Sequence, residues 1–296
     1  MAKSVVVVGS ANLDTVLGVP RIPSPGETVS ATSQGQYAGG KGLNQAIAAS
    51  RAGAHTQMIA ALGQDAAGDQ LYEVMAASSL QTAGVRRVAG PTGTAMIVVD
   101  DSAENSIVVF PGANAQLTAL STADRALIAA SDVLLLQGEV PWATNVAAAE
   151  CARAAHSRVV LNAAPAIPLD DRLLELVDVL IVNEYEARIV SGQDDDSRAA
   201  QELAARTPAL IVTLGAAGSA LYTHGTRVMV PAFTVQAVDT TGAGDTFCGA
   251  FGAALAEGMS LAGAVRFGSA AASCAVQTRG AVPSIPERAA IDAVLR

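Results

Sequence analysis

The stretch with the clearest capacity for chemistry is VDTTGAGDTFCGA, residues 238–250. Two aspartates, Asp239 and Asp245, bracket a turn of small residues that opens into a run of small and apolar residues. Gly242 and Gly244 allow the backbone to turn tightly, so that several amides at a helix start can face one anion. An acid inside that turn predicts a site where an anion meets a proton acceptor. A helix-capping aspartate after a glycine turn is the structural alternative. A P-loop is excluded, because no Lys-Ser/Thr pair follows the glycines.

A second glycine-rich turn, YAGGKGLNQA at residues 37–46, also precedes a predicted helix. Its glycines allow close backbone approach, while Lys41 and Asn44 offer hydrogen-bond donors for hydroxyl groups. Upstream, GSANLD contains Asp14, whose carboxylate can accept from two vicinal hydroxyls, as in a sugar. An ordinary loop-to-helix junction and a turn aspartate remain the structural alternatives for these two stretches.

Two further stretches follow predicted strands. In VNEYEA, Asn183 and Glu186 have the spacing of a helix capping box. The functional alternative is that Asn183 reaches phosphate oxygens and Glu186 holds water around Mg²⁺. TLGAAGSAL, residues 213–221, either lets a nucleotide lie against its backbone or forms a plain hairpin.

The elements that must position these residues alternate along the chain. Runs rich in Val, Ile and Leu predict buried strands at 4–10, 132–138, 157–164, 178–184 and 209–215. Alanine-rich patterns predict helices at 145–156, 171–177, 184–192 and 197–207. This alternation predicts an α/β fold of Rossmann type, with an open, mainly parallel sheet flanked by helices on both faces. Ligands bind at the carboxyl ends of such strands, so the polar residues that end the runs are expected along one edge: Asn12, Glu139, Asn162 and Asn183.

Residues 26–40 and 92–114 break this pattern with residue alternation and turn chemistry, including a predicted hairpin turn at DDSAEN, residues 100–105. They predict a small β-sheet lid, inserted at about 15–39 and 92–110 into a single domain spanning residues 1–296. Exposed strand edges in such a lid invite pairing, so a homodimer joined through the lid is expected.

Composition excludes several classes of protein. The formal net charge of −9 argues against nucleic acid as the main partner. Three widely spaced cysteines fit neither a disulfide framework nor a zinc site, which predicts a reducing cytoplasm. The sequence shows no run of about 18 apolar residues, so no membrane span is expected, and the start MAKSVVVVGS is too short for a signal peptide. The three histidines have no partner motif, so proton transfer is expected to fall to a carboxylate.

Together these stretches resemble the ribokinase family of carbohydrate kinases, also called the PfkB family, over nearly the whole chain from GSANLD to GAVPSIP. DTTGAGDTFCGA looks like the C-terminal signature of the family, and GGKGLNQAIAA looks like its N-terminal signature. PSPGETV, AENSI and PGAN are similar to its ribose-phosphorylating members in particular. The resemblance implies the ribokinase-like fold. It also implies transfer of the ATP γ-phosphate to the 5-hydroxyl of D-ribose, giving D-ribose 5-phosphate and ADP.

The resemblance also implies roles for individual residues. Asp245 would be the catalytic base, and the amides of Gly242, Ala243, Gly244 and Asp245 would stabilise the transferred phosphoryl group. The sugar would be bound by Asn12, Asp14, Gly40, Lys41, Asn44, Glu139 and Asp245. ATP, carried with Mg²⁺, would be bound by Asn183, Glu186, Thr213, Gly215, Gly218, Gly244 and Ser269. K⁺, a monovalent activator, would lie among Asp239, Thr241, Val276, Arg279, Ala281 and Ser284.

Two departures from the family pattern concern these sites. Gly138 stands where members often have Leu, which is expected to alter the sugar pocket slightly. Gly242 stands where some members have Ala, a change that an anion hole made of amides tolerates.

Other functions remain as alternatives. Within the family, 2-deoxyribose, fructose or adenosine could replace ribose. A catalytically inactive sugar-binding or regulatory protein would be favoured by an altered Asp245 or a broken GAGD, and both are intact. A dinucleotide-binding oxidoreductase would need GxGxxG after the first strand, where this chain has GSANLD.

Overall fold

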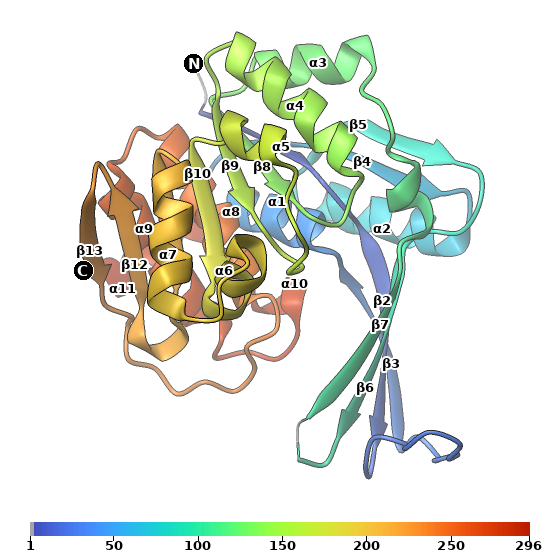
Figure 1. Ribbon diagram of the computed structural model, residues 1–296. Helices are drawn as coiled ribbons and strands as arrows, with labels where there is room; N and C mark the ends of the chain where they lie inside the picture. The colour runs from blue at the N-terminus through green and yellow to red at the C-terminus, as the bar shows by residue number, and fades with distance from the viewer. Residues whose placement is uncertain (1–2, 103) are drawn as a thin grey trace.

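A large central sheet and a smaller second sheet organise the computed structural model, which describes residues 3–102 and 104–296 (Figure 1). Within those residues nine strands form the central sheet, in the spatial order β13 (Thr226–Val230), β12 (Ser219–Thr223), β11 (Ala209–Thr213), β10 (Val179–Asn183), β9 (Arg158–Asn162), β8 (Val133–Gln137), β1 (Ser4–Val8), β4 (His55–Gly63) and β5 (Gln81–Val88). Neighbours from β11 to β5 are parallel, whereas β12 and β13 are antiparallel. The carboxyl ends of the parallel strands therefore share one edge.

Helices cover both faces of the central sheet (Figure 1). One face carries α1 (Lys41–Arg51), α2 (Ala66–Ala77), α8 (Ala243–Ala256), α9 (Leu261–Ala275) and α11 (Arg288–Leu295). The other carries α3 (Thr122–Ala129), α4 (Trp142–Ala154), α5 (Asp171–Leu176), α6 (Glu184–Ser191) and α7 (Asp196–Arg206). Two short 3₁₀ turns, η1 (Gly112–Gln116) and η2 (Gly215–Ala217), and the short helix α10 (Ala281–Ser284) lie in the connections.

The burial of β1 shows why its valine run forms a central strand. Val5 and Val7 pack into the core beneath α1 and α8, while Val6 and Val8 pack into the core on the opposite face. All four side chains are fully buried. A strand that is covered on both faces needs apolar side chains at every position, not at alternate ones.

The small sheet extends away from the helical layers at the bottom of Figure 1. Over the described residues it contains four strands, in the order β3 (Ser33–Gly39), β2 (Asn12–Val19), β6 (Thr94–Asp100) and β7 (Asn105–Phe110). β2 pairs with β6 in parallel, and the other two pairs are antiparallel. Segments more than 80 positions apart in sequence thus meet in one sheet.

The structure confirms the expected fold class, the strands and helices of the main α/β pattern, and the second sheet. Two details differ. Asp14 lies inside β2 and not in a turn, because β2 begins at Asn12. The first inserted segment starts within β2, is irregular over residues 20–32 and becomes a strand again only at Ser33. The expected turn at DDSAEN joins β6 to β7, although its residue 103 lies outside the described residues. The division into one domain with an inserted lid stays a prediction.

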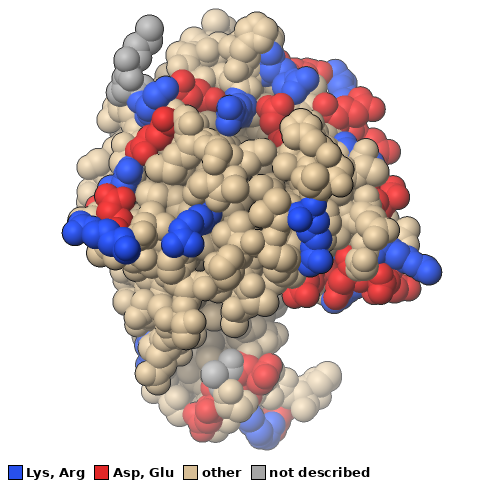
Figure 2. Space-filling view, turned by 90° about the vertical axis from the view of Figure 1, so that its left-hand side faces the viewer, with Lys and Arg blue, Asp and Glu red and all other residues tan. Residues whose placement is uncertain are grey.

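The surface of the protein carries charges of both signs. On the face seen in Figure 2, acidic and basic side chains are interspersed around a broad uncharged area, with no continuous basic stripe. Of the helices in the described part of the chain, none has the length and apolar character needed to cross a bilayer. The three histidines are exposed.

Candidate active site

Asp245 occupies the first turn of α8, at the carboxyl edge of the central sheet. Gly242 caps this helix in the left-handed conformation, with φ of 73°. A β-carbon at Gly242 would lie 3.0 Å from Cβ of Ala281, so the turn combines an unusual backbone angle with a close neighbour. The predicted glycine turn into a helix is therefore confirmed.

The amides of this turn are only partly engaged. The Ala243 amide donates to the Thr240 carbonyl at 3.2 Å, and the Thr246 amide donates to the Gly242 carbonyl at 2.8 Å. The amides of Gly244 and Asp245 donate to no atom of residues 3–102 or 104–296. Two free N–H groups at a helix start are suited to an anion.

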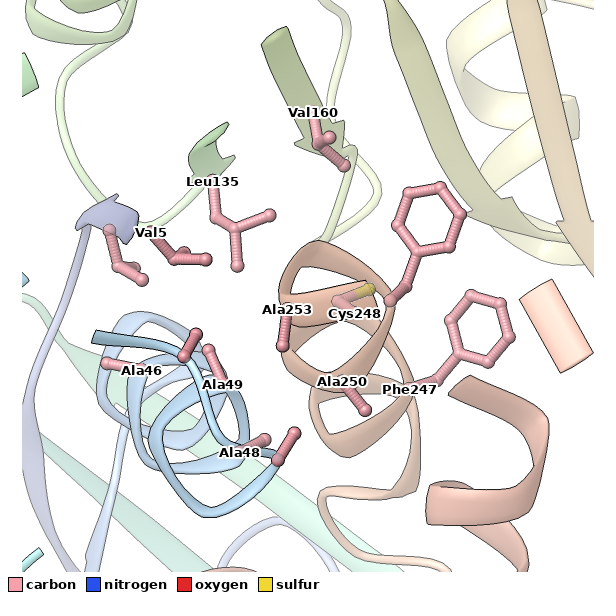
Figure 3. Packing of buried hydrophobic residues seen from close by; sticks show 14 of the residues in the cluster. Val5, Ala46, Ala48, Ala49, Leu135, Val160, Phe247, Cys248, Ala250 and Ala253 are labelled. Carbon is pink, nitrogen blue, oxygen red and sulfur yellow. The ribbon is translucent and has the colours of Figure 1, made fainter. Parts of the chain in front are cut away.

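Helix α1 packs directly against α8 through small side chains. Figure 3 shows Ala48 and Ala49 of α1 on the side toward Ala250 and Ala253 of α8. Gly249 makes this approach possible, since a β-carbon there would lie 2.5 Å from Cβ of Ala48. Close packing of the two helices brings the GGKGLNQ turn beside the GAGD turn, about 200 positions later in the sequence.

Two neighbouring amide side chains of α1 hold the carboxylate of Asp245. Asn44 Nδ2 donates to Oδ2 at 3.0 Å, and Gln45 Nε2 donates to Oδ1 at 3.1 Å. Asp245 is 8% exposed. Asp245 is therefore more than a helix cap: its carboxylate is fixed by side chains from a different helix.

Lys41, the first residue of α1, brings a positive charge to this carboxylate. Burial lowers the pKa of its amine, but attraction to Asp245, Glu139 and Glu186 outweighs burial and raises the pKa above its usual value. The amine therefore stays protonated and partly neutralises the acids around it.

Glu139 anchors the start of α1. Its Oε2 accepts from the Lys41 amide at 2.9 Å and from the hydroxyl of Ser10. A carboxylate at this position also complements the positive end of the helix dipole. Glu139 thus orders the backbone of the glycine turn.

Asp14 faces the same region from the small sheet. Its Oδ1 accepts from the Ala95 amide at 2.9 Å. Burial raises the pKa of Asp14 to about 6, the Ala95 hydrogen bond opposes this rise, and the charge of Glu139 adds to it. Nearby, Asn12 Oδ1 accepts from Asn114 Nδ2 at 2.7 Å, so the buried Asn12 side chain is held in place by η1.

A cavity of about 440 Å³ opens on the other side of the GAGD turn. It brings together five of the residues expected to bind ATP: Thr213, Gly215, Gly218, Gly244 and Ser269. The hairpin β11–η2–β12 forms one wall and α9 forms another, so TLGAAGSAL is both a hairpin and a cavity wall. Most of the lining is apolar or backbone, which suits a flat aromatic ligand.

Asn183 and Glu186 do not line this cavity. They form the capping box of α6: Asn183 Oδ1 accepts from the Glu186 amide at 2.7 Å, and Glu186 Oε2 accepts from the Asn183 amide at 2.8 Å. Asn183 pairs with Thr213 across β10 and β11, so it still lies beside a cavity residue. Burial raises the pKa of Glu186, and the nearby charge of Asp245 adds to the rise.

The residues expected around K⁺ gather beside the GAGD turn. Asp239 accepts from the Thr241 amide at 2.9 Å and from the Gly280 amide at 2.8 Å, which ties the two loops together. Burial raises the pKa of Asp239, but these hydrogen bonds outweigh it and leave the pKa lowered. The Val276 carbonyl accepts from two amides, and the Ala281 carbonyl accepts from the Ser284 hydroxyl. Within the described residues no group of three His, Cys, Asp or Glu side chains is placed to hold a metal.

Sequence reasoning missed three parts of this region. Gln45 carries no signal of its own although it stands next to Asn44, and the sequence marks Asn114 only as part of the PGAN motif. The loop of residues 232–237, which lines the cavity, was not assigned a role. Gly138, which stands where family members often have Leu, lies close to Trp142: a β-carbon at Gly138 would lie 3.2 Å from the Trp142 ring.

Known proteins resemble the chain in sequence and fold. The model for pfkB family carbohydrate kinases matches residues 2–288. A ribokinase of Haemophilus influenzae is 41% identical, over 97% of each chain, and a ribokinase of Bacillus subtilis is 37% identical, over 99% of each. The structure of Arabidopsis thaliana ribokinase complexed with ribose and ATP superimposes with a TM-score of 0.93 at 35% identity, covering 100% of this chain and 99% of that one. The chain therefore belongs to the pfkB family of carbohydrate kinases.

Proposed function

We propose that the protein phosphorylates D-ribose at its 5-hydroxyl with ATP, releasing D-ribose 5-phosphate and ADP. The observation that carries the proposal is the position of Asp245 between two recognition regions. On one side lie Asn44 and Lys41 of α1, and on the other lies the cavity bounded by Gly244. Relatives of 37–41% identity over almost their whole length are ribokinases, and one similar structure holds ribose and ATP.

The proposed sugar site offers hydrogen-bond partners of both kinds. Asp14 and Asn12 accept from hydroxyls, and Lys41 donates to them. Asn44 Oδ1 is buried and meets no donor among the described residues, so a sugar hydroxyl would satisfy it. Gly40 allows close backbone approach, and Glu139 supports the turn that carries it.

Asp245 acts as the base in this mechanism. The 5-hydroxyl lies against its carboxylate and attacks the γ-phosphorus in line with the leaving β-phosphate oxygen. Phosphoryl transfer passes through a loose transition state, so the hydroxyl proton moves to Asp245 late. A carboxylate is a weak base for an alcohol, but late transfer makes only a modest demand on it.

Charge on the transferred phosphoryl group is stabilised by the GAGD turn. The free amides of Gly244 and Asp245 point from the helix start, and Gly242 and Ala243 complete the turn. Preorganised donors of this kind stabilise developing charge without reorganising during the reaction. The nucleotide lies in the cavity along Thr213, Gly215, Gly218 and Ser269, with Asn183 and Glu186 at its phosphate end.

Two cations complete the proposal. Mg²⁺ accompanies ATP, and Glu186 would hold its water shell, because one oxygen of the carboxylate remains beyond the capping box. K⁺ would be held by oxygens of the paired loops, namely Asp239, Thr241, Val276, Arg279, Ala281 and Ser284. Backbone carbonyl, hydroxyl and carboxylate oxygens fit a hard cation. Positive charge there would strengthen the anion hole next to it.

The proposed assembly is a homodimer joined through β7, the edge strand of the small sheet. All six residues of β7 are exposed, and Ile107, Val109 and Phe110 are each at least half exposed. Apolar edge strands of this kind invite pairing with another chain. We expect light scattering to give a mass of twice 29.7 kDa.

Substitution Val108→Lys should then reduce the mass to that of one chain, because it places a charge in the interface. Val228→Lys is the matched control, since Val228 lies on β13, the edge strand of the main sheet. A monomeric parent protein, or a dimer that survives Val108→Lys and dissociates with Val228→Lys, would contradict this assembly.

The proposed location is the cytoplasm. The three cysteines of the described residues, Cys151, Cys248 and Cys274, are unpaired. Free thiols are typical of reducing compartments, where ATP is also supplied.

The first test of the function is ATP-dependent ADP release with D-ribose, 2-deoxyribose, fructose and adenosine, each with and without K⁺. We expect turnover to be highest with ribose and to rise several-fold with K⁺. Turnover only with fructose or adenosine would keep the Asp245 chemistry and overturn the sugar assignment. An equal rate without K⁺ would remove the cation from the proposal, and no turnover at all would favour a binding protein.

A further inference from the structure

A buried network of amide side chains lies directly behind Asp245, on the side away from the GAGD amides. Gln45, Gln137 and Asn145 are fully buried, and Asn162 is 9% exposed. Burying this many amides is costly unless each finds partners. None of them has a role in the proposed reaction described above.

Gln45 is the centre of this network. Its Nε2 donates both to Asp245 Oδ1 at 3.1 Å and to Asn162 Oδ1 at 3.2 Å. Its Oε1 accepts from Gln137 Nε2 at 2.8 Å. Because a carboxylate accepts only, the nitrogen of Gln45 must face Asp245, which leaves its Oε1 to accept from Gln137 Nε2.

The network is anchored in rigid elements. Gln137 ends β8, and its backbone carbonyl accepts from Asn145 Nδ2 of α4 at 2.7 Å. Asn162 ends β9, and its Nδ2 donates to the Ile181 carbonyl of β10 at 3.3 Å. The carboxylate of Asp245 is thereby connected through one side chain to the ends of two strands.

We infer that Gln45 is a positioning residue for the phosphoryl transfer, which holds the Asp245 carboxylate in the orientation that receives the hydroxyl proton. The inference rests on the proposed function above. Asn44 binds the other carboxylate oxygen from the sugar side, so the pair prevents rotation of the carboxylate. Gln45 is fully buried and acts through Asp245. A small displacement of a reacting group costs about 100-fold in rate.

The first variant, Gln45→Met, keeps the length of the side chain and removes its donor and acceptor. We expect kcat to fall 10- to 100-fold, with the KM for ribose within about threefold of the parent value. Ser157→Ala is the matched control, because it removes a buried hydroxyl that donates to the Ser131 and Ile128 carbonyls, before β9 and away from Asp245. It should lower Tm while leaving kcat unchanged.

The second variant, Gln45→Glu, distinguishes positioning from a structural role. It replaces the donor that faces Asp245 with a carboxyl, so that the two acids share a proton. The charged or titratable groups facing Asp245 are Lys41, Glu186 and Cys248, and they are the same in parent and variant. The ratio of kcat in the variant to kcat in the parent therefore isolates the new pair. We expect this ratio to change more than threefold between pH 6 and pH 9.

The outcomes distinguish a failure of the inference about Gln45 from a failure of the proposed function. A constant ratio across this pH range, or a Gln45→Met protein with lowered Tm and kcat within twofold of the parent, would overturn the inference and leave the function intact. If Gln45→Met does not fold, the pH ratio of Gln45→Glu decides. A parent protein without ribose turnover would overturn the proposed function and the inference with it.

Discussion

Substitution of Asp245 by Ala is expected to lower kcat for ribose by about 10³- to 10⁴-fold, the upper part of the range for a general base. The affinity for ribose should fall only about tenfold, because a single hydrogen bond to a charged group is lost. This difference arises because the carboxylate receives the proton only as the phosphoryl group is transferred. Steady-state ADP release and calorimetric titration with ribose measure the two quantities separately.

Asp245→Asn is the companion variant, since it keeps the shape of the side chain and removes its basicity. It should lose turnover to a similar extent. Its Tm should also fall, because its NH₂ group faces the donors Asn44 Nδ2 or Gln45 Nε2. Near-normal turnover in either variant would refute the assignment of Asp245 as base.

Asp14→Asn is expected to weaken catalysis and to stabilise the protein at the same time. Asn keeps one accepting oxygen and loses the other together with the charge, so kcat/KM for ribose should fall about 10- to 100-fold, at about 1.5–3 kcal/mol for the charged hydrogen bond that is lost. In the parent, kcat/KM should fall as pH drops below about 6, where Asp14 becomes protonated. The kcat/KM of the variant should not show this decrease at low pH.

The stability effect follows from the same pKa. Asp14 has an ordinary pKa of 3.8, which burial in the fold raises to about 6. The folded protein binds this proton more tightly than the unfolded chain, so stability is lost as pH rises from 3.8 to about 6. Above pH 6 the cost approaches about 3 kcal/mol, and Asn avoids it. Asp14→Asn should therefore raise Tm at pH 8 and leave it unchanged below pH 4.

Asp65 provides a control, because its pKa is shifted in the opposite direction to that of Asp14. Burial raises its pKa, but hydrogen bonds from Thr92 and Gly68 outweigh burial and leave the pKa lowered. Asp65→Asn should therefore lower Tm at pH 8. A fall in Tm for both variants at pH 8 would contradict the account of Asp14.

Local residue patterns were sufficient to predict the strands of the main sheet. The runs around Val5–Val8 and Val179–Val182 are apolar at every position because both faces are covered, and this pattern is visible within a few residues. A turn was the structural alternative for Asp14, because the pairing that makes it a strand residue comes from Tyr37 of β3, more than 20 positions later. Pairing at such a distance leaves no mark in the sequence around Asp14.

The candidate site could likewise be predicted only where the residues carry a local signal. The glycines of GAGD and GGKG and the acid Asp245 were predicted from residue type and spacing. Gln45 has no local signal, because its importance depends on contacts with Asp245 and Asn162, more than 100 positions away. The capping box of Asn183 and Glu186 was visible in the sequence, but its position beside the cavity was not.

The separation of the two sheets has a consequence for the energetics of assembly. Asp14 belongs to the small sheet and Asp245 to the helical body, so a sugar held by both spans two parts of the chain. The proposed subunit contact, β7, lies in that same small sheet. By thermodynamic linkage, any factor by which ribose tightens or loosens the dimer is also the factor by which dimer formation changes the affinity for ribose. Where ribose binding and dimer formation are coupled, dilution of the protein would change its affinity for the sugar without altering one residue of the pocket.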